Sequence, residues 1–248
     1  GNTPTFLPWT KPPAPAPAAG TATNNGVPTA AAAAGGTAGA VPTQAAPAAP
    51  REQVVVTSDL FKATIDSEGA TVNHLELLKY DEADRTKRVV LFENGSPATR
   101  YVAQTGLLNP VAGDAFPNHL TAMTPKAGPR TMADGQNTLE VSFESAPVGG
   151  LKYIKTYVFK RDDYVIGVRH EVVNVSDQPR DAQLYMQLLR HGTVAAGTMF
   201  GTNTFTGPAA YTNEKKFHKL DFKDIAKGKV EPPPPANDGW IAMVQHYF

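Results

Sequence analysis

Two pairs of neighbouring residues have the chemical types that acid–base catalysis uses. Asp162 and Asp163 are adjacent carboxylates, and His170 is followed directly by Glu171. Acid–base chemistry requires such groups to reach the same reacting atom. Neighbouring residues on a strand point to opposite faces, so we expect His170 and Glu171 to diverge. Asp162 and Asp163 follow two basic residues at the end of an alternating segment, which favours a charged hairpin turn.

The other residues that could do chemistry are scattered. The six histidines stand singly, at positions 74, 119, 170, 191, 218 and 246. The chain has no cysteine, which excludes disulfides, zinc–thiolate sites and cysteine nucleophiles. It also lacks the Gly-x-Ser-x-Gly, phosphate-loop and His-Glu-x-x-His patterns. We therefore predict that the protein is not an enzyme and has no catalytic, cofactor-binding or metal-binding residues.

An aromatic segment among small polar residues could instead line a binding surface. Phe200, Asn203 and Phe205 lie among glycines and threonines, and Tyr211 follows shortly after them. We take these four residues as the candidate groove or partner surface, for a peptide or a sugar. The alternative is that their rings close the end of a hydrophobic core.

The last ten residues have the spacing of an amphipathic helix. Six apolar residues form one helical stripe there. They are Trp240, Ile241, Met243, Val244, Tyr247 and Phe248. Because Trp and Tyr suit a membrane–water interface, we predict a C-terminal amphipathic helix next to the membrane surface. Packing of the stripe on the rest of the chain remains the alternative.

Composition divides the 248 residues at about residue 50. Residues 1–50 contain 16 Ala and 10 Pro, and Lys11 is their only charged residue. Because so few large side chains cannot offset the entropy of ordering, we predict a disordered, low-complexity tether. Residues 51–248 are expected to fold. No run of 18 apolar residues and no signal peptide is present, so we expect any addressing segment to have been removed.

Charge argues against one class of partner. Without Lys11, residues 51–248 hold 22 basic and 23 acidic residues, a net charge of −1. No global field would attract a polyanion, so we predict no nucleic-acid binding.

Period-two alternation of apolar and polar residues is the main secondary-structure signal. It recurs between turn signals in segments 61–66, 139–144, 153–159 and 164–175. Repeated strands without long intervening helical patterns predict an all-β fold, a large antiparallel sandwich. The edges of such a sandwich could bind a peptide as an added strand, and region 160–210 is our candidate.

Several motifs carry a resemblance to a known family. They are Thr206–Tyr211, Lys215–Phe217, Gly239–Phe248, Val56–Phe61, Ile65–Ala70 and Thr156–Tyr164. Together, over residues 53–248, the chain resembles the large periplasmic domain of the YidC membrane protein insertase family of Gram-negative bacteria. The closing motif is the most specific. Gly69-Ala70 stands where the family is expected to have two glycines, which indicates a slightly different turn.

This resemblance implies a fold, a place and partners. It implies a galactose mutarotase-like β-supersandwich on the periplasmic face of the cell inner membrane. It implies a docking or chaperone module that assists insertion and folding of nascent inner-membrane proteins, in contact with the Sec translocon including SecD and SecF. It supplies no catalytic residues and no cofactors. A free sugar- or peptide-binding periplasmic β-sandwich is the alternative function.

Overall fold

The structure, a computed structural model, describes residues 51–82, 84–111, 115–192, 205–230, 236 and 238–245. The predicted tether, residues 1–50, lies outside these ranges. Apart from one short helix, the regular secondary structure of the described part is antiparallel β-sheet, so the predicted all-β sandwich is confirmed. No helix among the described residues is both long enough and apolar enough to cross a bilayer.

The largest sheet has six strands in the order β1-β2-β3-β4-β5-β10. Its strands are β1 (Gln53–Thr57), β2 (Phe61–Asp66), β3 (Thr71–Asp81), β4 (Arg88–Glu93), β5 (Tyr101–Leu108) and β10 (Gln183–Arg190). The alternation that predicted β2 is visible in its burial, since Phe61, Ala63 and Ile65 face the core.

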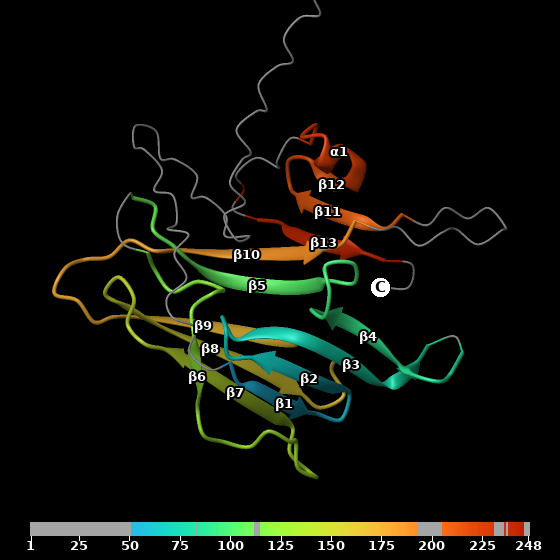
Figure 1. The fold of residues 1–248 in the computed structure, drawn as a ribbon, viewed down its shortest axis with the longest axis horizontal. Helices are drawn as coiled ribbons and strands as arrows, with labels where there is room; N and C mark the ends of the chain where they lie inside the picture. Colours follow the sequence, from blue (N-terminus) through green and yellow to red (C-terminus); the bar gives the residue numbers. More distant parts are fainter. Residues whose placement is uncertain are drawn as a thin grey trace, which may run out of the picture.

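A second sheet of four strands, in the order β6-β7-β8-β9, lies against the first (Figure 1). Its strands are β6 (Met123–Pro125), β7 (Thr138–Ser145), β8 (Leu151–Lys160) and β9 (Ile166–Asn174). β8 is the most deeply buried of the four, and its alternate residues Tyr153, Lys155 and Tyr157 point between the two sheets.

The core fills the space between β1–β3 of the large sheet and β7–β8 of the second sheet. Phe143 and Phe159 from the second sheet are fully buried there, with Ile65 and Leu77 from the first. Each of these side chains contributes on the order of 1.5–3 kcal/mol by leaving water.

The turn between β2 and β3 is held tightly inside the fold. Gly69 (φ 66°) and Ala70 (φ 45°) both adopt left-handed backbone conformations. A Cβ at Gly69 would lie 2.1 Å from the backbone oxygen of His119, so only glycine fits this position. Ala70 takes the second left-handed position where a second glycine was expected.

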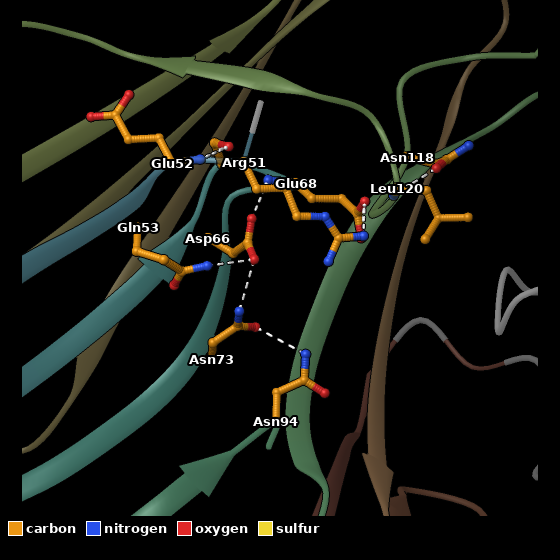
Figure 2. A network of polar contacts seen from close by, with 10 residues as sticks. Arg51, Glu52, Gln53, Asp66, Glu68, Asn73, Asn94, Asn118 and Leu120 are labelled. Carbon is orange, nitrogen blue, oxygen red and sulfur yellow. Dashed lines mark hydrogen bonds and ion pairs between the residues drawn. The ribbon is translucent and has the colours of Figure 1, made fainter. Parts of the chain in front are cut away.

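Polar contacts fix the strands on either side of this turn (Figure 2). Asp66 accepts hydrogen bonds from the side chains of Gln53 and Asn73, at 2.7 Å and 2.9 Å. Its other oxygen accepts the backbone N–H of Glu68 at 2.8 Å, and Glu68 forms an ion pair with Arg51. The Asp66 carboxylate is therefore occupied in joining β1, β2 and β3.

A third sheet of three strands, in the order β12-β11-β13, forms the C-terminal part of the described fold. It comprises β11 (Gly207–Thr212), β12 (Lys216–Lys219) and β13 (Trp240–Val244), and α1 (Phe222–Ala226) follows β12. Asp221 caps α1 by accepting the backbone N–H of Lys223.

The predicted C-terminal amphipathic helix is wrong for the residues that the structure describes. Trp240–Val244 is strand β13, paired antiparallel with β11. A short apolar run fits a strand as well as a helix, and here the ring of Trp240 stacks on Tyr211 across the pair. Tyr247 and Phe248 lie outside the described residues.

Candidate functional site

The two main sheets end in exposed edge strands on the same side of the sandwich. β9 is the last strand of the second sheet and pairs with β8, and β10 is the last strand of the large sheet and pairs with β5. Figure 1 shows β9 in one layer and β10 in the other. An edge strand presents backbone N–H and C=O groups that can pair with another extended chain.

The register of β9 determines which of its side chains point between the sheets. Residues opposite each other in an antiparallel pair project to the same face. Val168 lies opposite Tyr157 and Val172 lies opposite Tyr153, and both tyrosines are buried between the sheets. Val168 and Val172 therefore point inward, yet 40% and 44% of their surfaces are exposed.

The same argument applies to β10. Met186 lies opposite Thr105, whose hydroxyl is 3.5 Å from that of Tyr153, so both point toward the second sheet. Leu184 lies opposite the core residue Leu107. Leu184 and Met186 are nonetheless 46% and 66% exposed. We call the inward-facing side chains Val168, Val172, Leu184 and Met186 the open edge.

A neutral polar pair lies beside the open edge. The hydroxyl of Tyr153 is 2.7 Å from Nδ1 of His170, which lies between Val168 and Val172 on β9. Burial, with a smaller effect of Lys155, lowers the pKa of His170 to about 4. Burial raises the pKa of Tyr153 to about 12. At neutral pH, Tyr153 and His170 are therefore both uncharged, and the inward row on β9 carries no charge.

Two buried side chains of β8 connect this region to the β2–β3 turn. The amine of Lys155 donates to the carbonyl of Gly69 at 2.6 Å, and the hydroxyl of Tyr157 donates to that of Ala70 at 2.6 Å. Full burial lowers the pKa of Lys155 to about 7 and raises the pKa of Tyr157. Neither group reaches solvent, so both anchor the turn.

A third tyrosine holds β10 from its other face. The hydroxyl of Tyr185 accepts the backbone N–H of His119 at 3.1 Å and lies 2.6 Å from Nδ1 of the same residue. Burial raises the pKa of Tyr185, so this hydroxyl stays protonated. The contact fixes the position of β10 and therefore of the open edge.

The carboxylate pairs considered for catalysis do not form a site. Asp162 lies in the turn after β8 with φ 57°, and Asp163 follows it, so the predicted charged turn is confirmed. His170 points inward to Tyr153, whereas Glu171 points outward and accepts from Arg169 at 3.3 Å. His170 and Glu171 therefore do not form the histidine and carboxylate that a sugar epimerase would need to point at one reacting atom.

One histidine–carboxylate contact was missed by the sequence reasoning. Nδ1 of His74 lies 2.9 Å from Glu93, and its Nε2 lies 3.9 Å from Glu76. Glu93 is far from His74 in sequence, and only the β3–β4 pairing brings them together. Within the described ranges, no three His, Cys, Asp or Glu residues are grouped so as to hold a metal ion.

Of the four residues of the predicted groove, the structure describes only Phe205 and Tyr211. Phe200 and Asn203 lie outside the described residues. Phe205 precedes β11, and the amine of Lys219 lies 4.9 Å from the centre of its ring. Tyr211, at the other end of β11, stacks on Trp240 instead. Sequence reasoning did not identify the open edge, although it did place the candidate partner surface within residues 160–210.

Of the residues predicted to approach the membrane, two are prominently exposed in the structure. Trp240 and Ile241 are about half exposed on β13, whereas Met243 is buried and Val244 is half-buried. In place of a helical stripe, their strand geometry puts Trp240 and Ile241 on opposite faces of the third sheet.

Comparison with known proteins gives a consistent result. Residues 53–248 match the family model described as the YidC periplasmic domain. The chain is 47% identical over 211 residues to a membrane protein insertase YidC of Cupriavidus necator, which covers 82% of this chain and 36% of that protein. It is 45% identical over 240 residues to that of Ralstonia nicotianae, covering 90% of this chain and 42% of the relative. The chain therefore spans well under half the length of these relatives.

Proposed function

Because the chain belongs to the YidC membrane protein insertase family, as its periplasmic domain, we propose that it assists insertion and folding of inner-membrane proteins without being an enzyme. In this role it is a docking and chaperone module on the periplasmic face of the inner membrane. Residues 51–248 act as the folded module, and residues 1–50 act as its tether.

The open edge is the observation that supports this role. Four apolar side chains on two edge strands are exposed although they point toward the inside of the sandwich. Their spacing of two or four residues along each strand matches the side-chain period of an extended chain. Edge backbone groups can supply hydrogen bonds, and the flexible thioether of Met186 can adapt to different side chains.

Charge also favours an apolar occupant. The inward row of β10 ends at Arg190, beyond Leu184, Met186 and Leu188. Around the open edge itself, the inward row of β9 contains two valines and an uncharged histidine, and that of β10 contains leucine and methionine. A charged segment would lose its hydration there without gaining a partner. An extended, uncharged, apolar segment of a nascent inner-membrane protein fits this edge best.

A pair of substitutions on one strand tests the proposal. Val172→Glu puts a charge on the open edge, whereas Val173→Glu puts the same charge on the opposite, equally exposed face of β9. In the full-length insertase, we expect Val172→Glu to weaken capture of an apolar segment about tenfold or more, because the carboxylate would lose water. Site-specific cross-linking to a nascent inner-membrane protein measures this. Equal capture by both variants would rule out the open edge as the binding surface.

We also propose contact with the Sec translocon, including SecD and SecF. The support is the family relationship of the chain. Cross-linking from the outward face of β9 in intact membranes, with and without SecD and SecF, tests this partner. Products that depend on those proteins are expected, and an unchanged pattern would contradict the contact.

A further inference from the structure

Three aromatic rings lie side by side across the third sheet. Phe217 on β12 and Trp240 on β13 both lie opposite Tyr211 on β11, so all three project to one face. The Trp240 ring stacks on Tyr211 with centroids 5.7 Å apart, and Phe217 lies 5.8 Å from Trp240. We call these three residues the aromatic row.

The aromatic row does not serve as a core. Phe217 and Trp240 each keep 49% of their surface exposed, and β12 and β13 are edge strands with no further described strand beside them. Exposed aromatic residues that gather in one place mark a surface that contacts something else. Indole and phenol rings combine an apolar body with a polar group, which suits the boundary between lipid and water.

The segment around the aromatic row carries a local excess of positive charge. Residues 214–229 hold six lysines against three acidic residues, a net charge of +3. The lysines are Lys215, Lys216, Lys219, Lys223, Lys227 and Lys229. All six are exposed, and among the described residues none forms an ion pair. Since residues 51–248 sum to −1, the rest of that part carries −4, so positive charge is concentrated here.

We propose that this face of the third sheet binds the surface of a lipid bilayer that contains anionic headgroups. The aromatic row enters the headgroup region, and Lys219 on the same face of β12, with Lys215 in the turn before it, attracts the lipid phosphates. The inference rests on the proposed function only for the place of the protein at the membrane. In this proposal, the third sheet sets the orientation of the open edge relative to the bilayer.

Tryptophan fluorescence tests the aromatic row directly. Trp9 and Trp240 are the two tryptophans of the chain, so a Trp9→Phe background reports on Trp240 alone. The full 248-residue chain is mixed with vesicles of phosphatidylethanolamine and phosphatidylglycerol, or of phosphatidylcholine alone. We expect a blue shift of the Trp240 emission with the anionic vesicles, which weakens as salt is added. No shift with either vesicle would overturn the proposal.

Matched variants test the charges and the ring of Phe217. The test variant changes Lys215, Lys216 and Lys219 to Gln. Its control changes three other exposed lysines, Lys62, Lys87 and Lys160, to Gln. At low salt, we expect the first to lower vesicle affinity on the order of 100-fold and the second to have little effect. Phe217→Gln is compared with Tyr80→Gln, another half-exposed aromatic.

Co-sedimentation with the anionic vesicles measures these affinities, and circular dichroism confirms that each variant is folded. Equal affinity of the lysine variant and its control would overturn the proposal, as would equal affinity of Phe217→Gln and Tyr80→Gln. The assay contains no nascent protein and measures no insertion, so failure here is distinct from failure of the proposed function.

Discussion

At the scale of single residues, the interior between the two sheets contains titratable groups whose ionisation is suppressed. Lys155 is fully buried, and its amine donates to a backbone carbonyl of the β2–β3 turn. His170 and Tyr153 form a neutral hydrogen-bonded pair beside the open edge. Burial is the main cause of all three pKa shifts, and its effect should therefore be measurable as a dependence of stability on pH.

Lys155 should make the protein more stable as pH rises above neutrality. Its pKa is about 7 in the fold against 10.5 for a free lysine, so between these values the unfolded chain binds more protons. The folding equilibrium constant should rise by up to about tenfold per pH unit in that window. Lys155→Met should remove this slope, and the exposed Lys62→Met should keep it. Urea unfolding at several pH values measures the slopes. Parallel profiles for all three proteins would contradict the assignment.

His170 should titrate far below an ordinary histidine. Its pKa is expected near 4 instead of 6.5, and NMR titration of its ring can measure it. Tyr153→Phe removes the hydroxyl that forms a hydrogen bond with Nδ1 of His170, so this change should shift the pKa of His170. Tyr80→Phe, on an exposed ring of β3, should not. A wild-type His170 that titrates near 6.5 would mean that the open edge carries charge at mildly acidic pH.

At the scale of elements, the sequence predicted most of what depends on local pattern. Alternation identified β2, β7, β8 and β9, and in the first three strands one face meets the core. The same argument failed at Trp240–Val244. Helical spacing is visible in that run, but pairing with β11 and the stacking of Trp240 on Tyr211 make it a strand. Local periodicity carries no information about such a partner.

The open edge could not be predicted residue by residue for the same reason. That Val168 and Met186 point toward the inside of the sandwich follows from the β8–β9 and β5–β10 registers. Their exposure follows from the order of strands, which leaves β9 and β10 at the edges of two sheets. Neither the register nor the strand order can be read from the local sequence. From the sequence, region 160–210 could only be named as a candidate sheet edge.

The attachment of β13 should depend on one glycine. Gly239 has φ 147°, and a Cβ there would lie 2.4 Å from the backbone oxygen of Tyr211. We expect Gly239→Ala to separate β13 from β11, since the backbone must shift to relieve the clash. Hydrogen exchange should then show lost protection in β13 and unchanged protection in β8.

Gly228→Ala is the matched control for that substitution. Gly228 also has a positive φ, 63°, but no atom lies within 4 Å of the position that a Cβ would take there. This change should cost about 1–2 kcal/mol of local strain and leave β13 protected. If both variants kept β13 protected, this would contradict the claim that the close contact between Gly239 and Tyr211 requires glycine.

At the scale of the whole molecule, two surfaces have different chemistry. The open edge is apolar and uncharged, and it suits an extended chain segment. The third sheet combines aromatic rings with lysines, and it suits a charged lipid surface. In the proposed function, the two surfaces together would hold an apolar segment close to the bilayer that the segment is to enter.

The most direct test of this account places a photoreactive amino acid at Met186 in the full-length insertase. The same amino acid at Leu189, which lies on the opposite face of β10 and is also exposed, is the control. During synthesis of an inner-membrane protein, we predict cross-links from position 186 to its apolar segments and few from position 189. Equal cross-linking from both positions, or none from position 186, would contradict the claim that the open edge receives nascent membrane segments.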